Sequence, residues 1–444
     1  MITAPICEFV RRYRYSGALR MHMPGHKGTA LLGPEPLDLT EIEGADVLYH
    51  AEGIIRESEA NAAALFGTKK TVYSAEGSSL CIRAMLYLTL LHARANHKKP
   101  VIAAGRNAHK VFMTAAALLD LDIRWIYGTE SVISCVITPA QLEDVIVSEN
   151  PAAVYITSPD YLGNIADIKS LSTVCKKHGV LLLVDNAHGA YLHFLPEPMH
   201  PMQLGADICC DSAHKTLPVL TGGAYLHIAH GTPDMFAQRA ESAMALFAST
   251  SPSYLILQSL DAMNPLLATS FPAQLKACAE RLDTLKAKLR AHGYALCGEE
   301  RTKLCLLPKS FGYTGTALAE ILTHHNIYCE FSDADHLVMM FTPETTPADF
   351  ARLERALLSV LPAPAILSKP PVPPHAERVL SPREALFSPS ETLPLSECEN
   401  RILADANVSC PPAVPLAVCG ERLTPEVISA MEYYGTEHCT VVVE

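Results

Sequence analysis

The chain has 444 residues, of which 49% are hydrophobic and 18% charged, and its 35 basic and 47 acidic residues give a formal net charge of −12. This length exceeds what one hydrophobic core usually organises, so we expect two or three domains, and the composition excludes a disordered chain or a coiled coil. Because no basic run is present to neutralise phosphates, we expect no nucleic-acid or membrane partner and favour a small cationic substrate.

The N-terminal residues and the cysteines indicate a cytoplasmic protein. The first eight residues lack a basic stretch followed by an apolar run, and Arg83 interrupts the longest apolar helix candidate well short of a membrane span. The 14 cysteines show neither a regular disulfide framework nor the spacing of a metal site. We therefore expect a reducing compartment, no membrane segment and no metal.

Residues 56–230 alternate between helical periodicity, a turn and a short apolar, β-branched run. Strands are predicted at residues 71–74, 101–104, 123–126, 154–157, 180–184, 207–210 and 224–228. The helices between them include one at residues 167–178, which Gly179 ends. This order predicts an α/β domain whose mostly parallel seven-stranded sheet has helices on both faces.

Beyond Pro265 the pattern changes to that of a smaller α+β domain. A long amphipathic helix is predicted at residues 272–292, short strands near 304–307 and 337–341, and a helix near 347–361. The six prolines within residues 362–374 indicate a stiff linker. We expect a large domain at residues 1–265, the small domain at 266–361, a linker at 362–380 and a C-terminal domain at 381–444.

Ligands of an open α/β sheet bind outside the carboxyl ends of its strands, and polar residues follow four of the predicted strand ends. Gly77, Ser78 and Ser79 open a helix after the first strand, where N–H groups and two hydroxyls favour phosphate binding. An ordinary serine N-cap is the alternative. His109 follows the second strand and either stacks on a planar cofactor or caps a helix.

The other two strand ends lead to Asp185 and Lys215. A carboxylate at the end of an apolar strand is costly unless paired, so Asp185 either meets a protonated pyridine nitrogen or makes a structural contact with an arginine or the backbone. His188 follows three residues later, close enough to touch the same ligand. Lys215 lies beside Ser212 and His214, where apolar surroundings favour a neutral amine that forms an imine. In this order the four places predict a pyridoxal 5′-phosphate (PLP) site.

Six motifs are spread over most of the chain: Met23-Pro24-Gly25-His26-Lys27-Gly28, Gly53-Ile54-Ile55-Arg56-Glu57, Ala64-Leu65-Phe66-Gly67, Val184-Asp185-Asn186-Ala187-His188-Gly189, Ser212-Ala213-His214-Lys215-Thr216-Leu217 and Ser249-Thr250-Ser251-Pro252-Ser253-Tyr254. On these motifs the chain resembles the ornithine/lysine/arginine decarboxylases, in the short bacterial form without an N-terminal receiver-like domain. The segment Ser381-Pro382-Arg383-Glu384-Ala385 looks like that family's terminal domain. The resemblance implies a large domain of PLP fold type I (aspartate-aminotransferase-like), a small α+β domain and a C-terminal α/β domain.

The resemblance also implies roles for single residues. Lys215 would carry the cofactor as a Schiff base, Asp185 would pair with the pyridinium and His109 would stack on the ring. The phosphate would be held by four side chains, those of Ser78, Ser79, Ser212 and His214. His188 would lie near the ring hydroxyl or the departing carboxylate, and His214 or Lys215 would supply the proton that replaces CO₂.

The reaction that the resemblance implies is decarboxylation of arginine, lysine or ornithine to an amine that serves as a polyamine precursor. The implied assembly is a homodimer or a higher homo-oligomer, because the segment Thr250-Ser251 reaches the neighbour's cofactor phosphate in related folds. An aminotransferase or another lyase on the same fold, and a catalytically lapsed homologue, remain alternatives.

Three residues are candidates for reading the far end of the substrate: Asp160, Tyr161 and Glu330. For Asp160 the alternative is a solvated loop aspartate, and for Glu330 it is burial behind a structural partner. Asp160-Tyr161 and Glu76 depart from the family pattern and put substrate choice in doubt more than cofactor binding.

Overall fold

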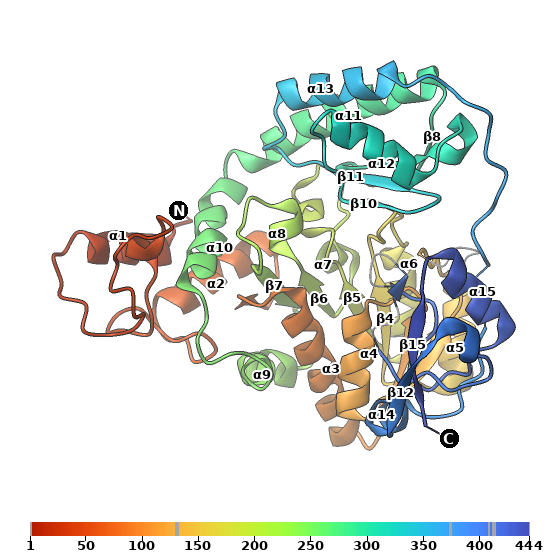
Figure 1. The fold of residues 1–444 in the computed structure, drawn as a ribbon. Coiled ribbons are helices and arrows are strands. Elements are labelled where there is room, and N and C mark those ends of the chain that lie inside the picture. The colour runs from red at the N-terminus through yellow and green to blue at the C-terminus, as the bar shows by residue number, and fades with distance from the viewer. Residues whose placement is uncertain (1, 129–132, 373–374, 407–408, 411–413, 444) are drawn as a thin grey trace. The chain divides into compact units, whose positions relative to one another are not determined.

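The computed structural model of the chain describes residues 2–128, 133–372, 375–406, 409–410 and 414–443. Its packing divides the chain into two compact units. The first comprises Met1–Lys99 and Ile168–Leu275, and the second comprises Pro100–Asp167 and Lys276–Glu444. Figure 1 labels the helices and strands of both units.

Seven strands form a mostly parallel sheet in the order β1-β7-β6-β5-β4-β2-β3. The strands are β1 (Lys70–Ser74), β2 (Val101–Gly105), β3 (Asp122–Ile126), β4 (Ala153–Thr157), β5 (Leu181–Asp185), β6 (Ile208–Asp211) and β7 (Ala224–Ile228). Strand β7 is antiparallel to β1 and β6, whereas β5 with β6, β2 with β3 and β2 with β4 are parallel pairs. The predicted fold class is confirmed, and each predicted strand ends within about one residue of the observed bounds.

The first unit combines the strands β1, β5, β6 and β7 with helices. These are α1 (Pro5–Arg14), η1 (Glu35–Leu37), α2 (Ile54–Phe66), α3 (Gly77–Ala95), α6 (Ile168–His178), η2 (Ala190–Phe194), α7 (Pro201–Leu204), α8 (Ala213–Thr216), α9 (Asp234–Ala245) and α10 (Tyr254–Leu267). In α3 the fully buried Leu80, Ala84 and Leu88 recur every four residues, so this face of the helix packs onto β6 and β7. Burying each leucine contributes about 2 kcal/mol.

The second unit holds β2, β3 and β4 with the helices α4 (Lys110–Leu119) and α5 (Pro139–Glu149). It also holds a four-stranded antiparallel sheet in the order β10-β11-β9-β8. Its strands are β8 (Ala295–Cys297), β9 (Lys303–Leu307), β10 (Phe331–Ser332) and β11 (Leu337–Met340). With them come α11 (Phe271–His292), η3 (Pro308–Phe311), α12 (Gly315–His324) and α13 (Pro347–Ser359), close to the predicted α+β elements.

This smaller sheet separates two hydrophobic cores. Leu304 and Leu306 of β9 lie in the core formed with α11, α12 and α13, which cover that face of the sheet (Figure 1). The residue between them, Cys305, lies in a second core with residues of the C-terminal region. The period of two along a strand explains the alternation, because successive side chains point to opposite faces.

The C-terminal region follows the proline-rich segment. Its elements are α14 (Pro382–Phe387), β12 (Ser390–Pro394), η4 (Leu395–Glu397), β13 (Ser409–Cys410), β14 (Val414–Pro415), α15 (Pro425–Tyr433) and β15 (His438–Val442). β12 pairs with β15, and β13 with β14, in two antiparallel pairs. The buried Arg106 guanidinium joins this region to the segment after β2, because it donates to the carbonyls of Pro415 and Leu416 and lies 3.3 Å from a carboxylate oxygen of Glu421.

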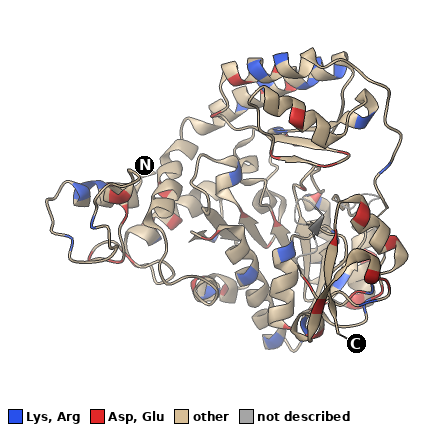
Figure 2. Cartoon of the chain, viewed as in Figure 1, with Lys and Arg blue, Asp and Glu red and all other residues tan. Residues whose placement is uncertain are grey.

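Charged residues of both signs are interspersed along the elements of the chain (Figure 2). Both α11 and α13, for example, carry basic as well as acidic residues. In the part of the chain that the structure describes, no helix is both long and apolar enough to cross a membrane.

Candidate active site

Asp185 ends β5, a strand whose five residues are all buried. Its side chain is 2% exposed, and its Oδ1 accepts hydrogen bonds from the Ala187 N–H at 3.2 Å and the Cys210 thiol at 3.7 Å. The parallel register places Asp185 beside Cys210 of β6. The carboxylate therefore lies next to the end of β6, the strand that leads to Lys215. The backbone contact considered as an alternative role for Asp185 is also present, as the hydrogen bond from the Ala187 N–H.

Lys215 lies on α8, the four-residue helix that follows β6. Its Nζ is 3.1 Å from Nε2 of His188, which is 6% exposed and lies in the turn after Asp185. The structure thus brings together a half-buried amine and a buried imidazole from two neighbouring strand ends. At this distance the two nitrogen atoms share a hydrogen bond and can exchange a proton.

Ser78 and Ser212 meet at the start of α3. Ser212 donates a hydrogen bond from its hydroxyl to Ser78 Oγ at 2.8 Å, and Ser79 is half-buried in the same first turn of α3. The N-cap of α3 is Glu76, whose side chain makes no capping hydrogen bond, so the alternative of a serine N-cap is wrong. Two hydroxyls and the N–H groups of a long helix together form a site suited to an anion.

Glycines allow the segment between β1 and α3 to approach residues 222–223 closely. Gly77 N donates to the Gly222 carbonyl at 2.7 Å, and a Cβ on Gly222, which has a φ of +99°, would lie 2.8 Å from the Ala75 carbonyl oxygen. His214 is held by Gly223, whose carbonyl lies 3.0 Å from the ring Nδ1. Burial lowers the pKa of His214. This favours the neutral imidazole near neutral pH.

A buried network that the sequence analysis did not identify supports the ends of β5 and β6. Asp211 lies between the strand residue Cys210 and Ser212, and its carboxylate accepts from Asn186 Nδ2 at 2.7 Å. Nε2 of His200 and Nε2 of His227 lie 2.9 and 3.2 Å from its other oxygen. Although burial opposes ionisation, the two imidazoles hold the pKa of Asp211 well below its usual range. Two polar residues within apolar strands, Asp211 and His227, were the signal in the sequence.

Glu76, which departs from the family pattern, has a defined partner in the first unit. Its Oε1 accepts a hydrogen bond from the Ser249 N–H at 2.7 Å. Ser249 begins the motif that ends at Tyr254, and the Tyr254 hydroxyl donates to the Ala45 carbonyl at 2.7 Å. Glu76 thus connects the segment before α3 to that motif.

His109 belongs to the second unit, where it is the N-cap of α4. Its Nδ1 accepts a hydrogen bond from the Val111 N–H at 3.2 Å, so the alternative of a helix-capping histidine is what the structure shows. Accepting at Nδ1 places the proton of a neutral ring on Nε2. Ring stacking on a cofactor stays a prediction.

The three candidates for the substrate's far end also lie in the second unit. Asp160 is 4% exposed and its carboxylate is hydrogen-bonded to Ser134 and Asn164, so the alternative of a solvated loop aspartate is wrong. Glu330 is exposed rather than buried, and it accepts a hydrogen bond from the Tyr161 hydroxyl at 2.8 Å. Burial and the Glu330 charge raise the pKa of Tyr161, which keeps the phenol protonated as a donor. The structure therefore pairs Tyr161 with Glu330, and it pairs the Asp160 carboxylate with Asn164 of the same loop and with the distant Ser134.

The donor set of the first unit fits PLP. The hydroxyls of Ser78 and Ser212 at a helix N-terminus suit a phosphate, the Lys215 amine suits an aldehyde, and the buried Asp185 carboxylate suits a protonated pyridine nitrogen. These groups follow the carboxyl ends of β1, β5 and β6, three strands of one sheet, and ligands of such sheets bind outside the carboxyl ends of the strands.

The family model for the major domain of Orn/Lys/Arg decarboxylases matches residues 4–295. The chain belongs to the Orn/Lys/Arg decarboxylase family. The arginine decarboxylase of Bacillus subtilis is 31% identical over 463 aligned residues, which cover 96% of this chain and 92% of that protein. The arginine decarboxylase of Halalkalibacterium halodurans is 28% identical and covers 95% of this chain and 91% of that protein.

Solved structures show the same fold. The lysine decarboxylase of Francisella novicida superimposes with a TM-score of 0.79 at 16% identity, covering 100% of this chain and 81% of that chain. The constitutive lysine decarboxylase of E. coli gives a TM-score of 0.77 at 16% identity, covering 99% of this chain and 82% of that one. These comparisons confirm the family and the PLP fold type I predicted from the motifs, and the family is one of PLP-dependent enzymes.

Proposed function

We propose that this Orn/Lys/Arg decarboxylase family member is a PLP-dependent carboxy-lyase acting on a basic amino acid, with arginine as its substrate. The observation that carries the proposal is the contact of the Lys215 amine with His188 at 3.1 Å, in the unit that also holds the buried Asp185 and the Ser78–Ser212 pair. Arginine is favoured because the curated relatives from Bacillus subtilis and Halalkalibacterium halodurans are arginine decarboxylases.

Seven side chains would bind the cofactor in this proposal. Lys215 would bind it covalently, Asp185 would keep a proton on the ring nitrogen, and the phosphate would be held by Ser78, Ser79, Ser212 and His214. His109 would stack on the ring. When bound, PLP supplies a sink for the electron pair that CO₂ leaves behind.

The chain's own residues would then control the proton. His188 Nε2 and Lys215 Nζ share a hydrogen bond at 3.1 Å, so His188 can pass a proton to Lys215 before Lys215 protonates the substrate's Cα. His214 is the second candidate donor, although burial lowers its pKa and reduces its protonated fraction. His188 would also lie near the departing carboxylate or the ring hydroxyl.

Glu330 would meet the distal cation of the substrate, with Tyr161 as its support. The Tyr161 hydroxyl occupies one carboxylate oxygen of Glu330 at 2.8 Å and so restricts its rotamer. The buried carboxylate of Asp160 is committed to Asn164 and Ser134 and would act on the substrate only through the loop that it holds.

We further propose a homodimer in the cytoplasm whose product is a polyamine precursor. The dimer is supported by large apolar side chains that the first unit exposes close to its N-terminus: Leu19 is 83%, Met21 80%, Leu31 81% and Leu32 91% exposed. Four strongly exposed large apolar side chains within a segment of 14 residues favour burial against a second chain. The cysteine-rich sequence without a disulfide framework supports a reducing compartment. The domain boundaries at residues 265, 361 and 380 belong to the same proposal.

The test is release of ¹⁴CO₂ from carboxyl-labelled arginine, lysine and ornithine by the purified full chain with PLP. We expect release from arginine, with kcat/KM at least about tenfold higher than for the other two, equivalent to about 1.4 kcal/mol. Release from lysine or ornithine alone would retain the class of reaction and refute the choice of arginine. Amino-group transfer to an oxoacid without CO₂ release would favour an aminotransferase, and no reaction with any of the three would refute the proposal.

A further inference from the structure

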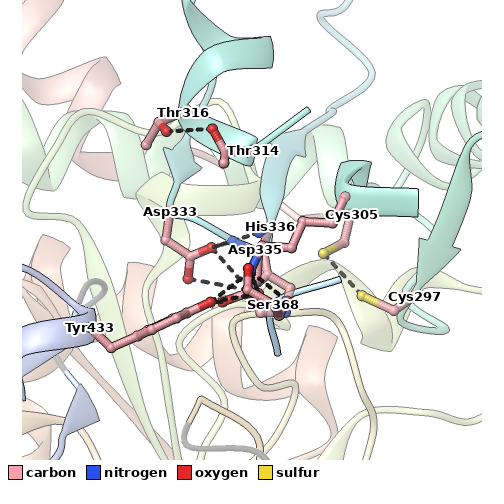
Figure 3. A network of polar contacts seen from close by, with 10 residues as sticks. Cys297, Cys305, Thr314, Thr316, Asp333, Asp335, His336, Ser368 and Tyr433 are labelled. Atoms are coloured by element: carbon pink, nitrogen blue, oxygen red, sulfur yellow. Dashed lines mark hydrogen bonds and ion pairs between the residues drawn. The ribbon is translucent and has the colours of Figure 1, made fainter. Parts of the chain in front are cut away.

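Two cysteines face each other across the β8–β9 hairpin of the small sheet. Cys297 and Cys305 are direct partners in the antiparallel register, and their Sγ atoms share a hydrogen bond at 3.1 Å (Figure 3). Cα atoms of such partners are about 4.5–5.5 Å apart, which lies within the range that disulfides span. The sulfur atoms would have to approach by only about 1 Å to reach the S–S bond length of about 2.05 Å.

The two thiols differ in exposure and acidity. Cys305 is 2% exposed, whereas Cys297 is half-buried at the end of β8. The hydrogen bond with Cys305 and the nearby His336 lower the pKa of Cys297, while that same hydrogen bond and burial raise the pKa of Cys305. When an easily ionised thiol lies beside a less acidic one, the first is oxidised to a sulfenic acid and the second then attacks that sulfur to form a disulfide.

His336 is fixed beside this pair by Asp333. The ring Nδ1 lies 3.2 Å from both carboxylate oxygens of Asp333, and the imidazole is 8% exposed. Burial alone would lower the pKa of His336, but the neighbouring Asp333 carboxylate raises it. Figure 3 shows the contacts of His336 with Asp333 and the contact between the two cysteines in one view. The protonated ring supplies the positive charge that a Cys297 thiolate needs.

We propose that Cys297 and Cys305 are a redox modification site that forms a reversible disulfide with a hydroperoxide as oxidant. The Cys297 thiolate attacks one peroxide oxygen, the O–O bond breaks, and the other oxygen leaves as an alcohol or water after taking a proton. Cys305 then loses its proton and attacks the oxidised sulfur of Cys297, which releases water as the S–S bond forms. The two thiols give up two electrons in total, and one hydroperoxide is reduced.

The disulfide would stiffen the loop between β8 and β9. The N–H groups of Glu299 and Glu300 in this loop donate to the Gly163 carbonyl at 2.7 and 3.0 Å. A Cβ on Gly298 would lie 2.2 Å from the Leu162 carbonyl oxygen, so the two segments are in close contact. Tyr161 lies in the contacted segment. An effect of oxidation on substrate binding therefore rests on the proposed function, whereas the disulfide itself does not.

Peptide mapping tests the disulfide directly. The full chain is treated with hydrogen peroxide, the remaining thiols are alkylated, and trypsin digestion follows without reductant. Trypsin places Cys297 in residues 291–301 and Cys305 in residues 304–309, and neither peptide contains another cysteine. We expect these two peptides to be joined with the loss of two hydrogen atoms, and dithiothreitol to separate them.

Two variants serve as controls. Cys329→Ser removes a half-buried thiol of the same unit, whose pKa burial raises to about 11, and should leave the cross-linked peptide unchanged. Cys305→Ala should remove the cross-link and leave Cys297 to proceed to the sulfinic acid.

Alkylation of both cysteines after peroxide treatment, or over-oxidation of Cys297 in the wild-type chain without a cross-link, would overturn the proposal. Since the result is read from peptides and not from turnover, it stands or falls separately from decarboxylase activity. If the cross-link forms in an active enzyme, a change in KM for arginine between the oxidised and reduced protein would show coupling to the Tyr161 segment.

Discussion

Replacing Asp211 with asparagine tests whether the buried network holds the ends of β5 and β6 in place. His200 Nδ1 accepts from the Met202 N–H at 3.3 Å, so its Nε2 carries the proton that points at Asp211. An asparagine must therefore turn its oxygen toward His200, which aims its NH₂ at the NH₂ of Asn186. Two buried donors would then face each other, and the charge that the imidazoles stabilise would be lost.

The size of the effect follows from the burial of the network. The side chains of Asp211, His200 and His227 are 0% exposed, and breaking a buried charged network costs about 3 kcal/mol of unfolding free energy. Urea denaturation followed by circular dichroism measures this difference. The matched control is Asp234→Asn, because Asp234 is 79% exposed and pairs with Lys69 at the surface, so its loss should cost less than about 0.5 kcal/mol.

The same network predicts a pH dependence. The pKa of Asp211 is lowered in the folded chain, so its contribution to stability is complete above the unfolded pKa of about 3.9 and declines as the pH falls below it. The difference in unfolding free energy between wild type and Asp211→Asn should therefore narrow as the pH is lowered from about 5 to about 3. Equal stability of the Asp211 and Asp234 variants at pH 7 would refute the reasoning.

Three further substitutions test the proposed roles. Asp185→Asn should retain PLP but lower the rate of CO₂ release by about 100-fold, because an amide does not hold the ring proton; this rate change corresponds to about 2.7 kcal/mol of activation free energy. Near-normal turnover would show that the role of Asp185 is misassigned. Ser212→Ala should raise the Kd for PLP by about tenfold in a fluorescence titration, because one hydroxyl of the phosphate site is lost. The control Ser242→Ala removes an exposed hydroxyl and should leave the Kd unchanged, and equal Kd values for the two variants would count against the phosphate site. Glu330→Gln should raise KM for arginine by about fivefold with little change in kcat. The control Glu320→Gln, also at an exposed glutamate, should leave KM unchanged, and an unchanged KM in Glu330→Gln would remove Glu330 from the substrate site.

Most of the strands were predictable because they are short apolar runs, and β2, β5, β6 and β7 are buried over their whole length. The run from Val180 to Val184 identified β5 to within one residue, and the polar residues after it identified Asp185. The family followed from six motifs, of which two, at residues 184–189 and 212–217, lie at the ends of β5 and β6. The order of the strands was not predictable from such runs, because a run does not reveal which strands pair: β7, for instance, lies between β1 and β6 and is antiparallel to both.

The contacts between side chains were less accessible to sequence reasoning. The Asp211 carboxylate meets His227 because β7 pairs with β6 in one particular register, and it meets His200 because a loop returns to the same place. Neither spacing along the chain nor residue type specifies such a meeting. Asp160 is a further example: the sequence left open a substrate contact or a solvated loop position, but the residue is buried and its carboxylate is hydrogen-bonded to Ser134 and Asn164.

Reductive trapping of the cofactor tests the central claim most directly. The purified full chain is incubated with PLP, reduced with sodium borohydride and digested, and the modified lysine is located by mass spectrometry. The account predicts a phosphopyridoxyl group on Lys215, and loss of that adduct in Lys215→Ala together with loss of CO₂ release. A protein that stays colourless and unmodified with PLP present, or an adduct found on another lysine, would contradict it.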